Sequence, residues 1–112
     1  MANKKLMERV LEEDFQHFGQ LCRFCRENSD PPMSRSALSK ILEYGNTQMY
    51  GYINAVERGQ YLGSPALVKG VVELFDLDKG YVLALLAKQA LFKYSKVLKH
   101  PLKQISVGNS SY

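Results

Sequence analysis

A glycine-asparagine-threonine break between two short apolar runs, within residues 34–59, places the strongest constraint on the fold of this chain. The first run follows Ser34, whose hydroxyl can cap a helix by accepting from the first-turn amides. Its apolar residues recur at helical spacing, so that one stripe can be buried: Ala37, Leu38, Ile41 and Leu42. Gly45 suits a left-handed helix end, and Asn46 or Thr47 suits the cap of a new helix. The first run therefore predicts a short helix that ends at a tight corner.

The second run predicts another short helix with one apolar side. Met49, Ile53 and Val56 follow one another at spacings of four and three residues and form its inner face. Gly59 then ends the run. Two helices that meet at a tight corner, the second one apolar on one side and polar on the other, are typical of a DNA-binding helix-turn-helix.

Two further helices are predicted before this stretch. Residues 3–13 have one apolar side, made of Leu6, Met7, Val10 and Leu11. Residues 15–28 repeat apolar side chains every three or four positions, at Phe15, Phe18, Leu21, Cys22 and Cys25. Arg23, Arg26 and Glu27 are expected to face outward. The Pro-Pro pair that follows ends this helix, because proline cannot donate the next backbone hydrogen bond.

Two more helices are predicted after the central stretch. Ser64 and Pro65 give a cap followed by proline at the first helical position. The buried stripe of this helix is Leu67, Val68, Val71, Val72 and Phe75. Asp78 can cap a long last helix over residues 79–98. Since no strand alternation and no repeat is present, we predict an all-α bundle of about five to six helices with a long C-terminal helix.

The pattern divides the chain into four parts. Residues 1–14 are an N-terminal helical extension, and residues 15–87 are the predicted helix-turn-helix domain. Residues 88–103 extend the last helix and are basic, and residues 104–112 are expected to form a flexible tail.

Positive charge gathers in the last third of the chain. The formal net charge is +4, and residues 76–112 hold six lysines against two aspartates. An excess of this kind suits an electrostatic surface that binds phosphates without regard to sequence. It equally suits a solubilising helix face and tail.

Neither the cysteines nor the histidines predict a metal or catalytic site. Cys22 and Cys25 form a Cys-x-x-Cys pair, but zinc takes about four ligands and no second pair is present. Both lie on an apolar helix face, which favours ordinary buried thiols. His17 and His100 are the only imidazoles. With no Gly-rich phosphate loop, no paired carboxylates and no nucleophile beside a base, we predict neither an enzyme nor a cofactor.

No stretch of the sequence predicts a membrane segment. The longest apolar run, residues 82–87, is far shorter than the ~20 residues that a spanning helix needs. The first residues lack the apolar core of a signal peptide before their acidic cluster. We therefore expect a cytoplasmic protein.

Four segments follow one another in an informative order: FGQLCRFCRE, MSRSALSKIL, INAVERG and SPALVKGVVELFDLD. The most specific cue is VERG at residues 56–59 followed by Ser64-Pro65 and an apolar helix. Residues 18–86 thereby resemble the phage repressor/Cro-like helix-turn-helix family, also called the xenobiotic-response-element family. The corner is longer than is usual in that family, and the basic last helix extends beyond the minimal domain. The resemblance implies a lambda-repressor-like fold and a dimeric, repressor-like transcriptional regulator.

The polar flank of the second helix is the predicted base-contacting surface, made of Thr47, Gln48, Tyr50, Gly51 and Asn54. Gln and Asn side chains can form two hydrogen bonds to adenine. Gly51 would let the backbone approach DNA closely, although it suits close packing against another helix equally well. No Lys or Arg lies between Lys40 and Arg58, so we expect a preference for A·T pairs or for DNA shape.

Phosphate contacts are predicted at Ser34, Arg35, Arg58, Gln60 and Lys69. For Arg58 an ion pair with a neighbouring carboxylate is an equal alternative. The last helix carries the predicted dimer surface, made of Tyr81, Leu85, Phe92 and Tyr94. The expected partners are double-stranded DNA, with half-sites about one turn apart, and a second copy of the chain. The alternative is a protein-interaction module, or an antitoxin-type partner-binding protein, that keeps the same fold.

Overall fold

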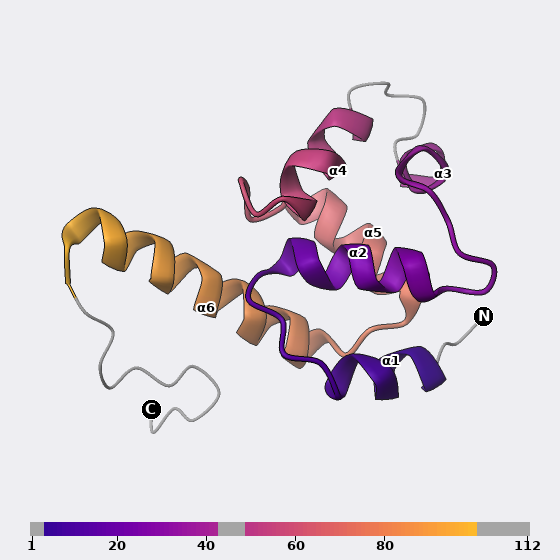
Figure 1. Ribbon diagram of the computed structural model, residues 1–112, viewed down its shortest axis with the longest axis horizontal. Coiled ribbons are helices and arrows are strands. Elements are labelled where there is room, and N and C mark those ends of the chain that lie inside the picture. The colour runs from indigo at the N-terminus through magenta and orange to yellow at the C-terminus, as the bar shows by residue number, and fades with distance from the viewer. Residues whose placement is uncertain (1–3, 43–48, 101–112) are drawn as a thin grey trace.

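The computed structural model describes residues 4–42 and 49–100, and every regular element within these ranges is a helix. The helices are α1 Lys4–Leu11, α2 Phe18–Asn28, α3 Arg35–Leu42, α4 Met49–Glu57, α5 Pro65–Phe75 and α6 Lys79–Leu98 (Figure 1). This confirms the predicted all-α bundle of five to six helices. The predicted corner at Gly45 and Asn46, and the predicted tail at residues 104–112, lie outside the described residues.

α2 occupies the centre of the bundle (Figure 1). α1, α4 and α6 pack against it, while α3 packs against α4 and α5. All six helices contribute to one apolar core, whose largest fully buried side chains include Phe18, Leu21, Leu38, Ile53 and Phe75. Leu6 and Val10 of α1 belong to the same core. The predicted N-terminal extension is therefore packed onto the rest of the chain.

The predicted helix ends are confirmed after α4 and before α3, α5 and α6. The hydroxyls of Ser34 and Ser64 each accept from the amide three residues further on, at 3.0 and 3.2 Å. The carboxylate of Asp78 does the same for α6 at 2.7 Å. Gly59, with φ +82°, follows α4 in the left-handed conformation that glycine tolerates.

α2 begins at Phe18 and not at Phe15 as predicted. His17 holds an extended backbone conformation, and its Nδ1 accepts from the Gln20 amide at 3.3 Å. The same amide also donates to the His17 backbone oxygen at 3.1 Å, so the imidazole is a second acceptor for this first-turn amide. Phe15 is still buried, because it packs edge-on against Phe24 with ring centroids 5.4 Å apart.

The buried apolar faces of α1 and α3 are narrower than predicted. Leu11 and Ile41 are exposed by 60 % and 49 %. In α3, Leu38 and Leu42 lie one turn apart and occupy the contact with α4 and α5, so Ile41 falls beside it. The interpretation of Cys22 and Cys25 as buried free thiols is confirmed. Burial raises the pKa of Cys25 to about 12, which keeps this thiol protonated.

The first half of α6 belongs to the core, and the second half extends beyond it (Figure 1). Val82 and Leu85 are buried, which corrects the placement of Leu85 on a dimer surface. Tyr81 is half-buried and packs against the core. Phe92 and Tyr94 are exposed by 58 % and 62 %. The predicted dimer residues therefore lie in two different environments.

At Gly19 the backbones of α2 and α4 lie close together. A Cβ on Gly19 would lie 1.8 Å from the backbone oxygen of Val56, whereas a Cβ on Gly51 would meet nothing within 4 Å. The contact between α2 and α4 therefore has no room for a side chain at Gly19.

We expect Gly19→Ala to lower the free energy of unfolding by about 1–3 kcal/mol, because α4 must shift to make room for the methyl group. Gly51→Ala should raise the free energy of unfolding by up to about 1 kcal/mol, since alanine stabilises an exposed helical position more than glycine does. Urea unfolding of both variants measures the difference, and equal stabilities would contradict this packing.

Candidate nucleic-acid interface

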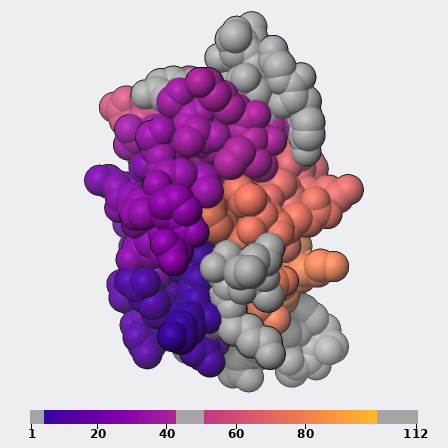
Figure 2. Space-filling view, turned by 90° about the vertical axis from the view of Figure 1, so that its right-hand side faces the viewer, coloured from indigo at the N-terminus to yellow at the C-terminus, as the bar shows by residue number. Residues whose placement is uncertain are grey.

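α3 and α4 lie together at one end of the molecule (Figure 1). Figure 2 looks onto the side of α3, where α1, the end of α2 and α3 follow one another along the surface. Thr47 and Gln48 lie outside the described residues, and so does the side chain of Tyr50. Of the predicted base-contacting residues, the structure therefore places Gly51 and the side chain of Asn54.

α4 turns one flank to the core and leaves the other open. Ile53 and Val56 are fully buried, as predicted. On the opposite flank Gly51 is exposed and Asn54 is half-buried. Close packing of Gly51 against another helix, the alternative explanation for this glycine, is wrong for the described residues, because the space beside it is open. A ligand could therefore approach the backbone at Gly51.

A buried carboxylate holds α4 in this orientation. Glu57, at the end of α4, has a side chain that is 1 % exposed. Both of its oxygens accept from Arg26 of α2, at 2.8 and 3.0 Å. Its Oε1 also accepts from Nε of Arg35, in the first turn of α3, at 2.9 Å. One glutamate therefore ties three helices together.

Arg26 completes the network and corrects the prediction that it faces outward. Arg26 is only 6 % exposed, and its guanidinium also donates to the backbone oxygen of Met33 at 3.0 Å. The hydrogen bond to Glu57 raises the pKa of Arg26 and outweighs the desolvation that would lower it. The sequence carried a signal for this pair: Arg26 lies four residues after Cys22, and Glu57 four residues after Ile53, on the apolar face of each helix.

The predicted phosphate contacts fall into two groups. Arg58, Gln60 and Lys69 are exposed, and none of the described residues forms an ion pair with Arg58 or Lys69. Arg35 is different, because its Nε pairs with Glu57 and its side chain is 31 % exposed. Ser34 is exposed, but its hydroxyl caps α3. Arg35 and Ser34 therefore already have structural roles within the chain.

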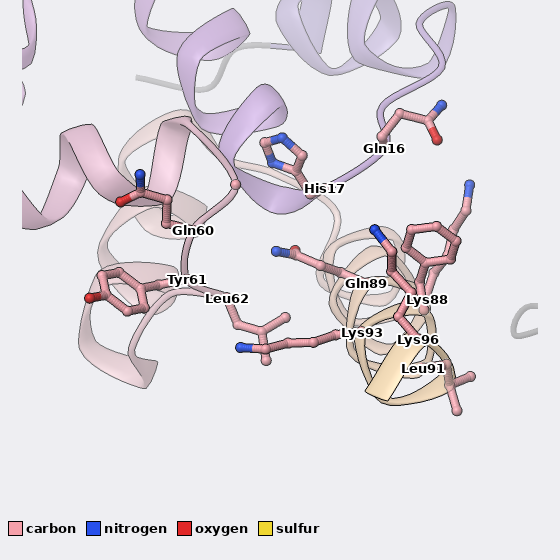
Figure 3. Close-up of a pocket in the computed structure, with 12 residues that line it drawn as sticks. Gln16, His17, Gln60, Tyr61, Leu62, Lys88, Gln89, Leu91, Lys93 and Lys96 are labelled. Atoms are coloured by element: carbon pink, nitrogen blue, oxygen red, sulfur yellow. The ribbon is translucent and has the colours of Figure 1, made fainter. Parts of the chain in front are cut away.

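A groove of about 600 Å³ separates the second half of α6 from the body (Figure 3). Its walls come from the turn before α2, the loop after α4, and α6. Lys88, Lys93 and Lys96 line it on α6 and Gln60, Tyr61 and Leu62 line it on the body, and the side chain of Lys93 extends toward Leu62. Gln89 closes one end by accepting from the Phe18 amide at 3.0 Å. Tyr61 stacks on Tyr52 of α4 with centroids 5.8 Å apart, which connects the groove to α4.

We expect Glu57→Ala to lower the free energy of unfolding by about 3–5 kcal/mol, because it leaves two arginines facing a buried site without a counter-ion. Glu73→Ala is the matched control, since it removes an exposed glutamate on α5 that forms no ion pair with the described residues. This control should lower the free energy of unfolding by less than about 1 kcal/mol. Thermal or urea unfolding measures both variants. A small loss for Glu57→Ala would show that the network does not hold the three helices.

His17 should make stability fall as the solution becomes acidic. Burial lowers the pKa of His17 below its usual 6.5, and its Nδ1 must be unprotonated to accept from Gln20. The stabilising contribution is thus complete above pH ~6.5 and is lost as the pH falls through the lower folded-state pKa. His17→Asn keeps a capping side chain that does not titrate. We expect it to flatten the dependence of stability on pH between about 7 and 5, which urea unfolding at several pH values measures; an unchanged dependence would contradict the role of the His17 imidazole.

The described residues contain no group of three or more His, Cys, Asp and Glu side chains that could hold a metal ion. Nor is any helix among them long and apolar enough to cross a membrane. Compared with models of protein families, with curated proteins and with solved structures, the chain gives no match.

Proposed function

We propose that this protein is a sequence-specific, repressor-like transcriptional regulator that binds double-stranded DNA in the cytoplasm. It would act as a dimer that contacts two half-sites, with α4 of each copy in the major groove. The observation that carries the proposal is the two-sided character of α4. Ile53, Val56 and Glu57 fix one flank in the core, while Gly51 is exposed on the opposite side and Asn54 is half-buried at the border between the two. A helix anchored in this way can present a polar flank to base edges without rearranging.

Base contacts in this proposal rely on amides and not on arginine. Asn54 can donate to and accept from one adenine, and Gly51 permits close approach of the helix backbone. Because no Lys or Arg lies between Lys40 and Arg58, the expected preference is for A·T pairs or for DNA shape. Gln48, Thr47 and Tyr50 remain predicted base contacts.

Phosphate contacts would come first from Arg58, Gln60 and Lys69, which are exposed around the end of α4 and on α5. Ser34 and Arg35, at the start of α3, are proposed as secondary contacts because each already has a partner within the chain. Such contacts position a protein on DNA and do not depend on base sequence.

The second candidate function is a protein-interaction module, or an antitoxin-type protein, with the same fold. The groove between α6 and the body favours it, because three lysines and exposed apolar side chains would suit an acidic, partly apolar segment of another protein. Salt dependence separates the two functions. Affinity of a regulator for duplex DNA should fall steeply with salt, whereas a module that does not bind DNA should show almost no slope.

Selection of bound duplexes from a random pool, followed by affinity measurements, tests the DNA-binding proposal. We expect Asn54→Ala to lose about 1–3 kcal/mol of discrimination at one or two A·T positions while it keeps most of its affinity for random DNA. Arg58→Ala and Lys69→Ala should weaken binding to every duplex and reduce the salt slope. Lys5→Ala, which removes an exposed lysine on α1, is the matched control. If Asn54→Ala weakened all duplexes equally, it would not be a base contact.

A further inference from the structure

α6 carries two apolar faces, and only one of them is used by the core. Val82 and Leu85 face the body. On the opposite side a second set follows at alternating spacings of four and three residues: Leu83, Ala87, Ala90, Tyr94 and Val97. With about 100° between successive residues, these five side chains form one line along the helix. We call them, together with the adjacent Leu98, the outer stripe.

The outer stripe is open to solvent in the described structure. Leu83, Tyr94, Val97 and Leu98 are exposed by 65 %, 62 %, 68 % and 73 %. Side chains of this size in one continuous patch mark an interaction surface more often than an ordinary monomer surface. No charged residue interrupts the stripe, because Lys88, Lys93 and Lys96 lie on the other sides of the helix. Its spacing matches the seam of two paired helices.

We propose that the outer stripe binds the outer stripe of a second copy of this chain, with the two α6 helices antiparallel. In this register Leu83 lies opposite the partner's Tyr94, and Ala87 lies opposite the partner's Ala90. A two-fold axis between the alanines repeats both contacts, so the two copies bury the same surface. The large side chains meet at both ends of the contact, and the small ones let the helices approach closely at the middle.

The charges at the two ends of α6 favour this direction. Lys93, Lys96 and Lys99 lie toward the end of the helix, while Asp76, Asp78 and Lys79 lie at its start, where two negative charges against one positive leave a net charge of −1. An antiparallel pair brings the basic end of one helix to the acidic start of the other, and the helix dipoles also oppose each other favourably. A parallel pair would gather the lysines of both copies at one end.

The position of α6 in the fold also permits this pairing. The body of each copy packs on the Val82 and Leu85 side, so two bodies would lie on the outer sides of the helix pair (Figure 1). Residues 83–97 span roughly 22 Å, and a single helix pair of this length buries less than the ~800 Å² per partner of a standard interface. We therefore expect a reversible dimer and not a permanent one.

This inference deepens the proposed function, in which a dimer contacts two half-sites, but it is tested without DNA so that the two can fail separately. Sedimentation of the full chain, from sub-micromolar to hundreds of micromolar, measures the dimer. Leu83→Glu and Tyr94→Lys should each raise the dissociation constant at least about tenfold, because each places a charge on the apolar contact. Phe92→Lys is the matched control, since Phe92 lines the groove on the other side of α6, and it should leave the constant unchanged.

The chain carrying both Leu83→Glu and Tyr94→Lys decides the direction of the helices. In the antiparallel pair each new glutamate lies opposite the partner's new lysine, so dimerisation should recover to within a few-fold of the parent. In a parallel pair like charges would meet and no recovery would occur. Both sites are exposed, so circular dichroism and thermal unfolding should confirm that every variant folds. A parent chain that stays monomeric at all concentrations, or a double variant without recovery, would overturn the proposal.

Discussion

The buried carboxylate of Glu57 is the interaction on which the arrangement of α2, α3 and α4 depends. Apolar contacts alone leave short helices free to slide and rotate, because they are not directional. α3 has only eight residues and buries Leu38 and Leu42 as its apolar anchors. The hydrogen bonds from Arg26 and Arg35 add the direction that so small an apolar contact cannot supply. Arg26 also reaches the backbone of Met33, so the network fixes the path that leads into α3.

This anchoring accounts for the open flank of α4. Gly19 brings the backbone of α2 against the end of α4, and Glu57 locks the rotation of α4 about its own axis. With Ile53 and Val56 committed to the core, Gly51 is left on the solvent side. Burying these charges costs desolvation free energy. In return the network fixes the orientation of α4, which is the property that a base-contacting helix would require.

Most of the fold could be predicted from the sequence, because local chemistry determines it. Ser34, Ser64 and Asp78 start helices through their own side chains. The spacing of Leu67, Val71 and Phe75 identifies a buried helix face without knowledge of the helix that packs against it. The site was harder, because its decisive contacts join residues far apart in sequence. Arg26 and Glu57 are 31 positions apart, and although each lies on the apolar face of its helix, neither shows by itself which residue it pairs with. Likewise, nothing local shows that Leu85 faces inward while Leu83 faces outward.

The second half of α6 has a consequence for the behaviour of the chain in solution. Beyond Gln89, whose side chain bonds to the start of α2, the remaining helical turns have few buried contacts. An unsupported stretch of this length is only marginally helical in water. Its amide hydrogens should therefore exchange with solvent much faster than those of the first half, along a gradient that steepens toward Leu98. Occupation of the outer stripe would slow that exchange, so the helical length of α6 would report on association.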